Sequence, residues 1–183
     1  RTPPHNAIQL LRSSKFRKLS EKAWICCLSK TYNSLLMWSY YTNNHKGICI
    51  GLNMGNVKKY LHSMLGQIVH TKAIKVSYTN ILCRPDYFNE FKDYQKYLLC
   101  TKARAWKHEK EKRLIIQEPY YIDKKQCFYP TIGKECFESL YLGIKIGEEK
   151  NTIIELARKL NPEIKIYQMQ PDPEAFRLVP KEL

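Results

Sequence analysis

The stretch Trp-Lys-His-Glu-Lys-Glu-Lys-Arg-Leu-Ile-Ile, at residues 106–116, holds the side chains best suited to chemistry. Two carboxylates and a guanidinium recur at every second position, as Glu109, Glu111 and Arg113. On a strand these three side chains lie on one face, because neighbouring side chains alternate. Paired carboxylates can divide roles, one staying ionised to stabilise positive charge while the other positions a nucleophile or accepts a proton. On a helix, Glu109 and Arg113 would form only a solvated ion pair.

The flanks of this segment favour the strand. The apolar run at 114–116 is rich in β-branched residues and is followed by Pro119. We therefore expect a helix to end at residues 106–108 and a strand to start at Lys110 or Glu111. Glu111 and Arg113 would then share a face at the mouth of a sheet. A purely structural role, in which these two residues pair with other groups and lock two elements together, stays open.

A second candidate group lies in the aromatic stretch Leu-Leu-Met-Trp-Ser-Tyr-Tyr at residues 35–41. Helical spacing places Leu35 and Trp38 on one face. One interpretation is that Trp38 and Tyr41 rim a pocket whose floor is formed by the strands that contain Cys26 and Cys49. The other is an ordinary core helix, which the same apolar stripe also predicts.

His45 and Lys46 stand in the turn between that helix and the next apolar strand. They are placed to meet a phosphate or carboxylate, and the alternative is a plain surface turn. Several motifs are absent from the sequence: G-x-G-x-x-G, the Walker lysine loop, G-x-S-x-G and H-E-x-x-H. Their absence argues against two common nucleotide-binding folds, a hydrolase triad and a metalloprotease.

The elements that must position these residues follow from apolar periodicity. Strands and helices alternate unevenly, and several strands follow one another late in the chain. This predicts an α+β fold whose sheet is mixed or mostly antiparallel and is flanked by helices. Expected caps are Asn33, Asp86 and Asn151. Strands are predicted at residues 23–28, 47–52, 73–78, 112–117, 138–146, 164–168 and 176–179, and helices at 34–42, 56–65, 86–106 and 152–160.

Length and charge bound the class of protein. The 183 residues predict one domain over 1–183, with a basic N-terminal segment at 1–22. The formal net charge of +14 predicts an anionic partner, either a nucleotide or a nucleic acid. Solubility alone is the competing explanation, because the lysines are dispersed and form no long basic block.

The seven cysteines show no C-x-x-C pair and no zinc-ribbon spacing, so we predict no metal site. Several lie in apolar runs, where cysteine packs as a small hydrophobic residue. Unpaired cysteines suit a reducing compartment, and no stretch approaches the roughly 20 apolar residues of a membrane span. We therefore expect a cytoplasmic location without membrane association.

Four motifs in order carry a resemblance to a known family: Cys-Leu-Ser at 27–29, Leu-Met-Trp-Ser-x-Tyr at 36–41, His-Lys-Gly-Ile-Cys-Ile at 45–50, and the segment 106–115. Their order and spacing, from about Trp24 to Phe176, resemble the bacterial family named domain of unknown function twenty-nine seventy-one. Some of its members are labelled abortive-infection-like. An upstream Tyr-His-Tyr-like strand and Asn-Asp-Pro-like turn, usual in that family, are absent here. We therefore expect either that the chain is a partial copy of the family domain or that part of that domain lies outside this sequence.

A looser resemblance is to ADP-ribosyltransferases, in which Leu28-Ser29 and Glu109-x-Glu111 would fill the second and third motif places. This likeness implies that Glu111 binds ribose hydroxyls and stabilises an oxocarbenium-like transition state, and that Glu109 orients the acceptor. It makes NAD the candidate cofactor, although the element that would hold the nicotinamide side has no counterpart in this sequence.

Three functions are therefore weighed. The first is a bacterial defence or stress effector with nucleotide-dependent, ADP-ribosyl-type transferase activity. The second is a non-catalytic basic module that binds nucleic acid, and the third is a partial domain with a structural role only. For the first, the predicted catalytic residues are Glu109, Glu111 and Arg113, and the predicted substrate-binding residues are Ser29, Trp38, Tyr41, His45, Lys46 and Trp106.

Overall fold

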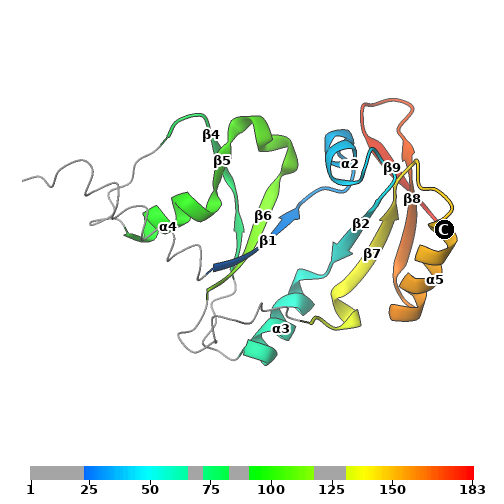
Figure 1. Ribbon diagram of the computed structural model, residues 1–183, viewed down its shortest axis with the longest axis horizontal. Helices are drawn as coiled ribbons and strands as arrows, with labels where there is room; N and C mark the ends of the chain where they lie inside the picture. Colours follow the sequence, from blue (N-terminus) through cyan, green and yellow to red (C-terminus); the bar gives the residue numbers. More distant parts are fainter. Residues whose placement is uncertain (1–22, 66–71, 83–90, 118–130) are drawn as a thin grey trace, which may run out of the picture.

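The computed structural model describes residues 23–65, 72–82, 91–117 and 131–183, and the predicted segment 1–22 lies outside them. It confirms the α+β class: the described strands form three sheets, which helices flank. Figure 1 shows a three-stranded and a four-stranded sheet side by side along the long axis. The single-domain organisation stays a prediction.

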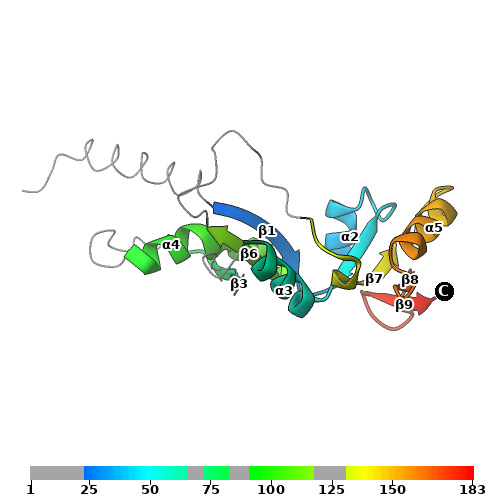
Figure 2. The same cartoon turned by 90° about the horizontal axis from the view of Figure 1, so that it is seen from below.

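The three-stranded sheet is antiparallel, in the order β1 (Ala23–Ser29), β6 (Glu111–Gln117) and β3 (Lys72–Lys75). Its side chains alternate between two covered faces. Leu114 and Ile116 pack against α3 (Met54–Leu65) on one face. Ile115 packs against α4 (Phe91–Cys100) on the other. In the turned view, α3 lies at the junction between the two larger sheets (Figure 2).

The four-stranded sheet has the order β2 (Ile48–Leu52), β7 (Phe137–Leu142), β8 (Lys165–Pro171) and β9 (Leu178–Glu182). It is mixed, because β7 and β8 are parallel and need a crossover, which α5 (Lys150–Leu160) supplies. Helices α2 (Leu35–Tyr41) and α5 cover opposite faces of this sheet (Figure 1).

The third sheet is a parallel pair of short strands, β4 (Ser77–Thr79) and β5 (Thr101–Ala103). It changes two predicted elements. The helix expected to reach residue 106 ends at Cys100, because Thr101–Ala103 pairs with β4 and then continues into the 3-10 helix η1 (Arg104–Glu109). The strand expected at 73–78 is broken at the buried Val76, whose N–H donates to Glu111 O at 3.0 Å. A second 3-10 helix, η2 (Lys134–Cys136), precedes β7.

The predicted helix starts are shifted. Ser34, not Asn33, caps α2, because the Ser34 hydroxyl accepts from Met37 N–H while the Asn33 side chain accepts from the Thr31 hydroxyl. The helix expected to begin after Asn151 starts at Lys150 and has no side-chain cap. Asp86, the third predicted cap, lies outside the described residues.

The cysteine prediction holds in part. Cys49, in the apolar run at 47–50, is half-buried and packs against the Trp38 cluster, as predicted. Cys26 and Cys27, in the run at 23–28, are exposed, which contradicts the prediction. They lie on β1, which is the outer strand of its sheet among the described residues and has a strand on one side only.

Candidate functional site

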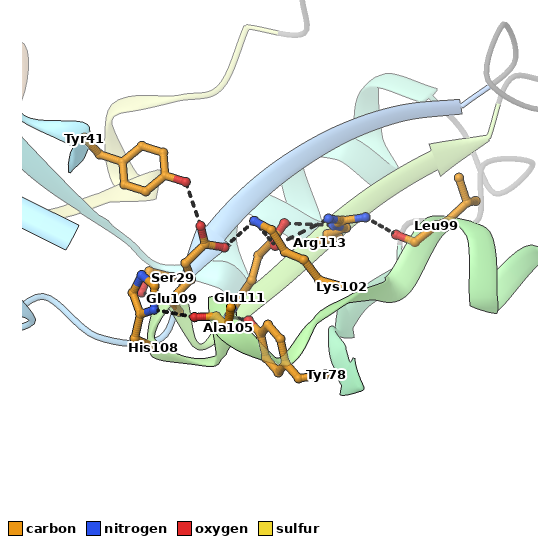
Figure 3. A network of polar contacts seen from close by, with 10 residues as sticks. All are labelled: Ser29, Tyr41, Tyr78, Leu99, Lys102, Ala105, His108, Glu109, Glu111 and Arg113. Carbon is orange, nitrogen blue, oxygen red and sulfur yellow. Dashed lines mark hydrogen bonds and ion pairs between the residues drawn. The ribbon is translucent and has the colours of Figure 1, made fainter. Parts of the chain in front are cut away.

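The candidate site is built where η1 passes into β6 (Figure 3). Glu109 ends η1, and Lys110 takes a left-handed conformation, with φ 46° and ψ 44°. Glu111 then begins β6, at the position the sequence predicts. The turn at Lys110 brings the carboxylate of Glu109 beside that of Glu111. Both residues are buried, with 3% of the surface of Glu109 and 4% of that of Glu111 exposed. Glu111 and Arg113 share a face of the strand, as predicted.

Two cations neutralise the two carboxylates. Lys102, on β5, binds Glu109 Oε2 and lies 3.4 Å from Glu111 Oε2. Arg113 donates from Nε to Glu111 Oε1 at 2.8 Å, and from Nη1 to the carbonyl oxygen of Leu99 at 2.6 Å. Because buried charges are costly unless paired, these two cations compensate the charge that the pair of carboxylates brings into the interior.

Three hydroxyl groups complete the network from other elements. The Tyr41 hydroxyl, on α2, donates to Glu109 Oε1 at 2.7 Å. The Ser29 hydroxyl, at the end of β1, donates to the Glu109 carbonyl oxygen at 2.8 Å. The Tyr78 hydroxyl accepts from Glu111 N–H at 2.8 Å. The network therefore joins α2, β1, β4, β5 and β6 at one point.

The pairing sets the protonation of the site. Burial alone would raise the pKa of Glu111, but the hydrogen bond from Arg113 and the neighbouring charges lower that pKa to about 2. Burial and a hydrogen bond to Glu111 raise the pKa of the Cys27 thiol to about 11. The bond to Glu109 raises the pKa of Tyr41. Glu111 is thus a fixed negative charge near neutral pH, suited to stabilising a cation and unsuited to accepting a proton.

Three partly exposed aromatic residues lie on or near the network. Tyr40, Tyr41 and Trp106 are 62%, 60% and 40% exposed. The Trp106 ring lies 4.9 Å from Lys102 Nζ, which is cation–π distance. The rings of Tyr40 and Trp106 lie about 6 Å from His108, at 6.2 and 6.0 Å. Exposed rings beside a buried charge offer stacking surfaces to a planar ligand.

The remaining predicted binding residues lie elsewhere. Trp38 is 2% exposed and packs against Met169 and Leu178, so its ring belongs to the core of the four-stranded sheet. Its edge still lines a small pocket of about 140 Å³, together with Ser29, Tyr41 and Cys49. The part of the predicted pocket formed by Trp38, Tyr41 and the Cys49 strand is therefore present, without Cys26.

His45 and Lys46 lie in the turn after α2, near the four-stranded sheet. The carbonyl oxygen of His45 accepts from Lys145 N–H at 3.0 Å. Across the ranges that the structure describes, no hydrogen bond or ion pair joins His45 or Lys46 to either buried glutamate. These two residues thus do not take part in the network.

Lys102 and Tyr78 are the network members that sequence reasoning missed. Lys102 falls inside the predicted long helix, seven residues before Glu109, and Tyr78 is one of 13 tyrosines. Only the pairing of β4 with β5 brings both to the end of β6.

The last two features concern metal ligands and membrane-spanning helices. Among described residues, no group of three or more His, Cys, Asp or Glu side chains gathers as metal ligands would. In the same part of the chain, no helix is both long and apolar enough to cross a lipid bilayer.

The fold and site therefore define an α+β protein with a buried, charge-balanced glutamate pair. Residues 37–114 match the sequence model of the family described as "Protein of unknown function (DUF2971)", which identifies a domain of that family over these residues. The match is shorter than the span of 24–176 expected from the motifs. It includes Tyr41, Lys102 and both glutamates but not Ser29. No curated protein and no solved structure matches the chain.

Proposed function

We propose that this protein is a nucleotide-dependent transferase, with chemistry similar to that of ADP-ribosyltransferases and NAD as the donor. One observation carries the proposal: Ser29, which would fill the second motif place, is the register partner of Glu111, which would fill the third. The Ser29 hydroxyl also binds the backbone of Glu109 across 80 residues of sequence. Two motifs far apart in the chain thus meet at one end of a strand pair.

The two glutamates are suited to different roles. Glu111, whose pKa of about 2 keeps it ionised, would bind ribose hydroxyls and stabilise positive charge on the sugar. Glu109, held between the Tyr41 hydroxyl and Lys102, would orient the acceptor. Arg113 positions Glu111 by binding its carboxylate and the backbone at Leu99.

The surroundings fit a nucleotide donor. The exposed aromatic residues Tyr40, Tyr41 and Trp106 suit stacking against a planar ring. When bound, NAD would supply an ADP-ribosyl group: the ribose–nicotinamide bond breaks with its electron pair on nicotinamide, and a bond forms to an acceptor that gives up a proton. The chain's own part is to hold fixed negative charge beside that sugar.

The cellular role within this proposal is that of a cytoplasmic bacterial defence or stress effector. It is motivated by the abortive-infection-like members of the resembling family. Expression of the wild-type protein should slow bacterial growth, and expression of Glu111→Gln should not. Equal growth of the two strains at matched protein levels would contradict this role.

The reaction is tested by following nicotinamide release from NAD with purified protein and a bacterial extract as the source of acceptors. Glu111→Gln should lower the rate by about 100-fold or more, the range seen when one preorganised electrostatic group is removed. The matched control is Glu138→Gln, which alters an exposed glutamate on β7.

Thermal melting separates loss of chemistry from loss of fold. A folded Glu111→Gln variant with unchanged turnover would sink the proposal, as would the absence of nicotinamide release by the wild type. If Glu111→Gln does not fold, Tyr41→Phe is the test variant instead. Tyr41 is largely exposed, and its hydroxyl binds Glu109. This variant should raise the KM for the acceptor.

A further inference from the structure

A basic hollow lies beside the glutamate network. It has a volume of about 730 Å³, and five of its eight lining residues are cationic. Among the residues that the structure describes, no Asp or Glu lines it. The wall consists of Lys30, Lys75, Val76, Ser77, Tyr78, Arg104, Lys107 and Lys110.

Three chain segments bring these cations together. Lys30 follows β1, and its N–H donates to the carbonyl oxygen of Lys110 at 3.2 Å. Lys75 ends β3, where the chain turns into β4. Arg104 and Lys107 stand on η1. The three segments are far apart in sequence, so the hollow is a product of the tertiary structure.

The left-handed turn at Lys110 separates the hollow from the network. Glu109 and Glu111, on either side of it, are buried and pair with the half-buried Lys102 and Arg113. Lys110 itself is exposed and lines the hollow. Tyr78 stands at the boundary: it lines the hollow, and its hydroxyl accepts from Glu111 N–H. Figure 3 shows Tyr78 on the side of Glu111 away from Tyr41.

Within the described residues, no carboxylate forms an ion pair with any of the five cations. In the part of the chain that the structure describes, every carboxylate that pairs with a cation does so at Lys102, Arg113 or Arg177. Like charges around one concavity repel each other, and the concave shape focuses their field. An anion that enters the hollow removes this repulsion.

We propose that the hollow is a binding site for the diphosphate group of a nucleotide. Its volume lies within the roughly 300–1,000 Å³ of small-ligand sites. Lysine ammonium groups bind phosphate as point charges, and Arg104 adds a planar fork that binds two phosphate oxygens. The Tyr78 hydroxyl accepts one hydrogen bond from the backbone and keeps its proton to donate to a phosphate oxygen.

The site goes beyond the proposed transfer reaction. It depends only on the charge and shape of the hollow, and neither Glu109 nor Glu111 lines it. Binding is therefore measurable without turnover. Glu111→Gln should bind inorganic pyrophosphate as the wild type does, so a failed transferase and a failed phosphate site give different results.

The experiment is isothermal titration calorimetry with inorganic pyrophosphate and with ADP. The test variant is Arg104→Ala/Lys107→Ala, on the wall of the hollow. The matched control is Arg158→Ala/Lys159→Ala, which removes the same two charges from exposed positions on α5. The test variant should lose about tenfold or more in affinity for pyrophosphate, because two charge-assisted contacts are lost. The control should bind within about twofold of the wild type, since distant surface charges are screened by salt.

Four results would overturn the site. The first is the absence of binding of either probe, and the second is an equal loss of affinity in the two double variants, which would mean diffuse attraction by net charge. The third is loss of pyrophosphate binding in folded Glu111→Gln. The fourth is tight binding of a short single-stranded oligonucleotide that pyrophosphate cannot displace, which would make the surface a nucleic-acid interface.

Discussion

The Tyr41 hydroxyl donates a 2.7 Å hydrogen bond to Glu109 Oε1, although 68 positions separate the two residues. The bond joins α2, which packs on the four-stranded sheet, to η1, which leads into the three-stranded one. Within the described network, Lys102 binds Oε2 of the Glu109 carboxylate and Tyr41 binds Oε1, so each carboxylate oxygen has one partner. The position of Glu109 thus depends on both halves of the molecule.

Tyr41→Phe should lower the free energy of unfolding by about 1 kcal/mol or less. A hydrogen bond to a charged group is worth about 1.5–3 kcal/mol, and the high exposure of Tyr41 reduces this. The melting temperature should fall by up to about 4 °C. Tyr40→Phe, a neighbouring exposed tyrosine whose ring lies by His108, is the control and should melt like the wild type. Equal shifts would show that the Glu109 bond contributes nothing.

Glu111 should make the free energy of unfolding depend on pH in the acid range. Its pKa in the folded protein, about 2, is lower than its ordinary value of 4.5, so its contribution is fully present above 4.5 and is lost as the pH falls toward 2. The shift corresponds to roughly 3 kcal/mol. Urea unfolding from neutral to acid pH should show the wild type more stable than Glu111→Gln, with a gap that narrows through this window. A gap independent of pH would contradict the ion pair.

Lys110 tests the left-handed turn between the glutamates. Lys110→Gly should be about 1 kcal/mol more stable than Lys110→Ala, because only glycine adopts a φ of 46° without steric cost. Both variants lose the same charge, so their difference reports the backbone. The control pair, Lys112→Gly and Lys112→Ala, lies in extended β6 and should show the opposite order. Denaturant unfolding measures both differences.

Cys27 should react slowly with iodoacetamide near neutral pH, although its side chain is exposed. The thiolate is the nucleophile, and a pKa of about 11 leaves little of it. Glu111→Gln should speed alkylation several-fold, because it removes the carboxylate that disfavours the thiolate. Cys26, whose pKa is raised by burial alone, is the internal control. Mass spectrometry of the Cys26→Ser and Cys27→Ser variants measures the alkylation of each cysteine separately. If Glu111→Gln changed the alkylation rates of Cys26 and Cys27 equally, the contact between Cys27 and Glu111 would be refuted.

Much of the local structure could be predicted from the sequence. The residues up to Gln117 predict a strand that starts at Lys110 or Glu111 and has Glu111 and Arg113 on the same face. The structure begins the strand at Glu111 and places both side chains on that face. The aromatic stretch at 35–41 predicts a helix, which is α2. These features depend on side-chain periodicity within a few residues, which a sequence displays directly.

The composition of the site could not be predicted in the same way. Lys102 and Tyr78 enter it only because β5 leaves the predicted helix and pairs with β4. Trp38 turns into the core because α2 packs on the four-stranded sheet. Such choices depend on which elements pair and which faces they bury, and no local pattern records them.

The sequence by itself thus determined the α+β class, a strand beginning at Lys110 or Glu111, and the shared face of Glu111 and Arg113. The tertiary structure alone decided that Glu109 joins them through a left-handed turn, that Tyr41 and Lys102 hold its carboxylate, and that five cations line one hollow. The physical reason is that strand alternation acts over neighbouring residues. Hydrogen bonding, charge pairing and burial instead act between segments far apart in the chain, as between Ser29 and Glu109, which are 80 positions apart.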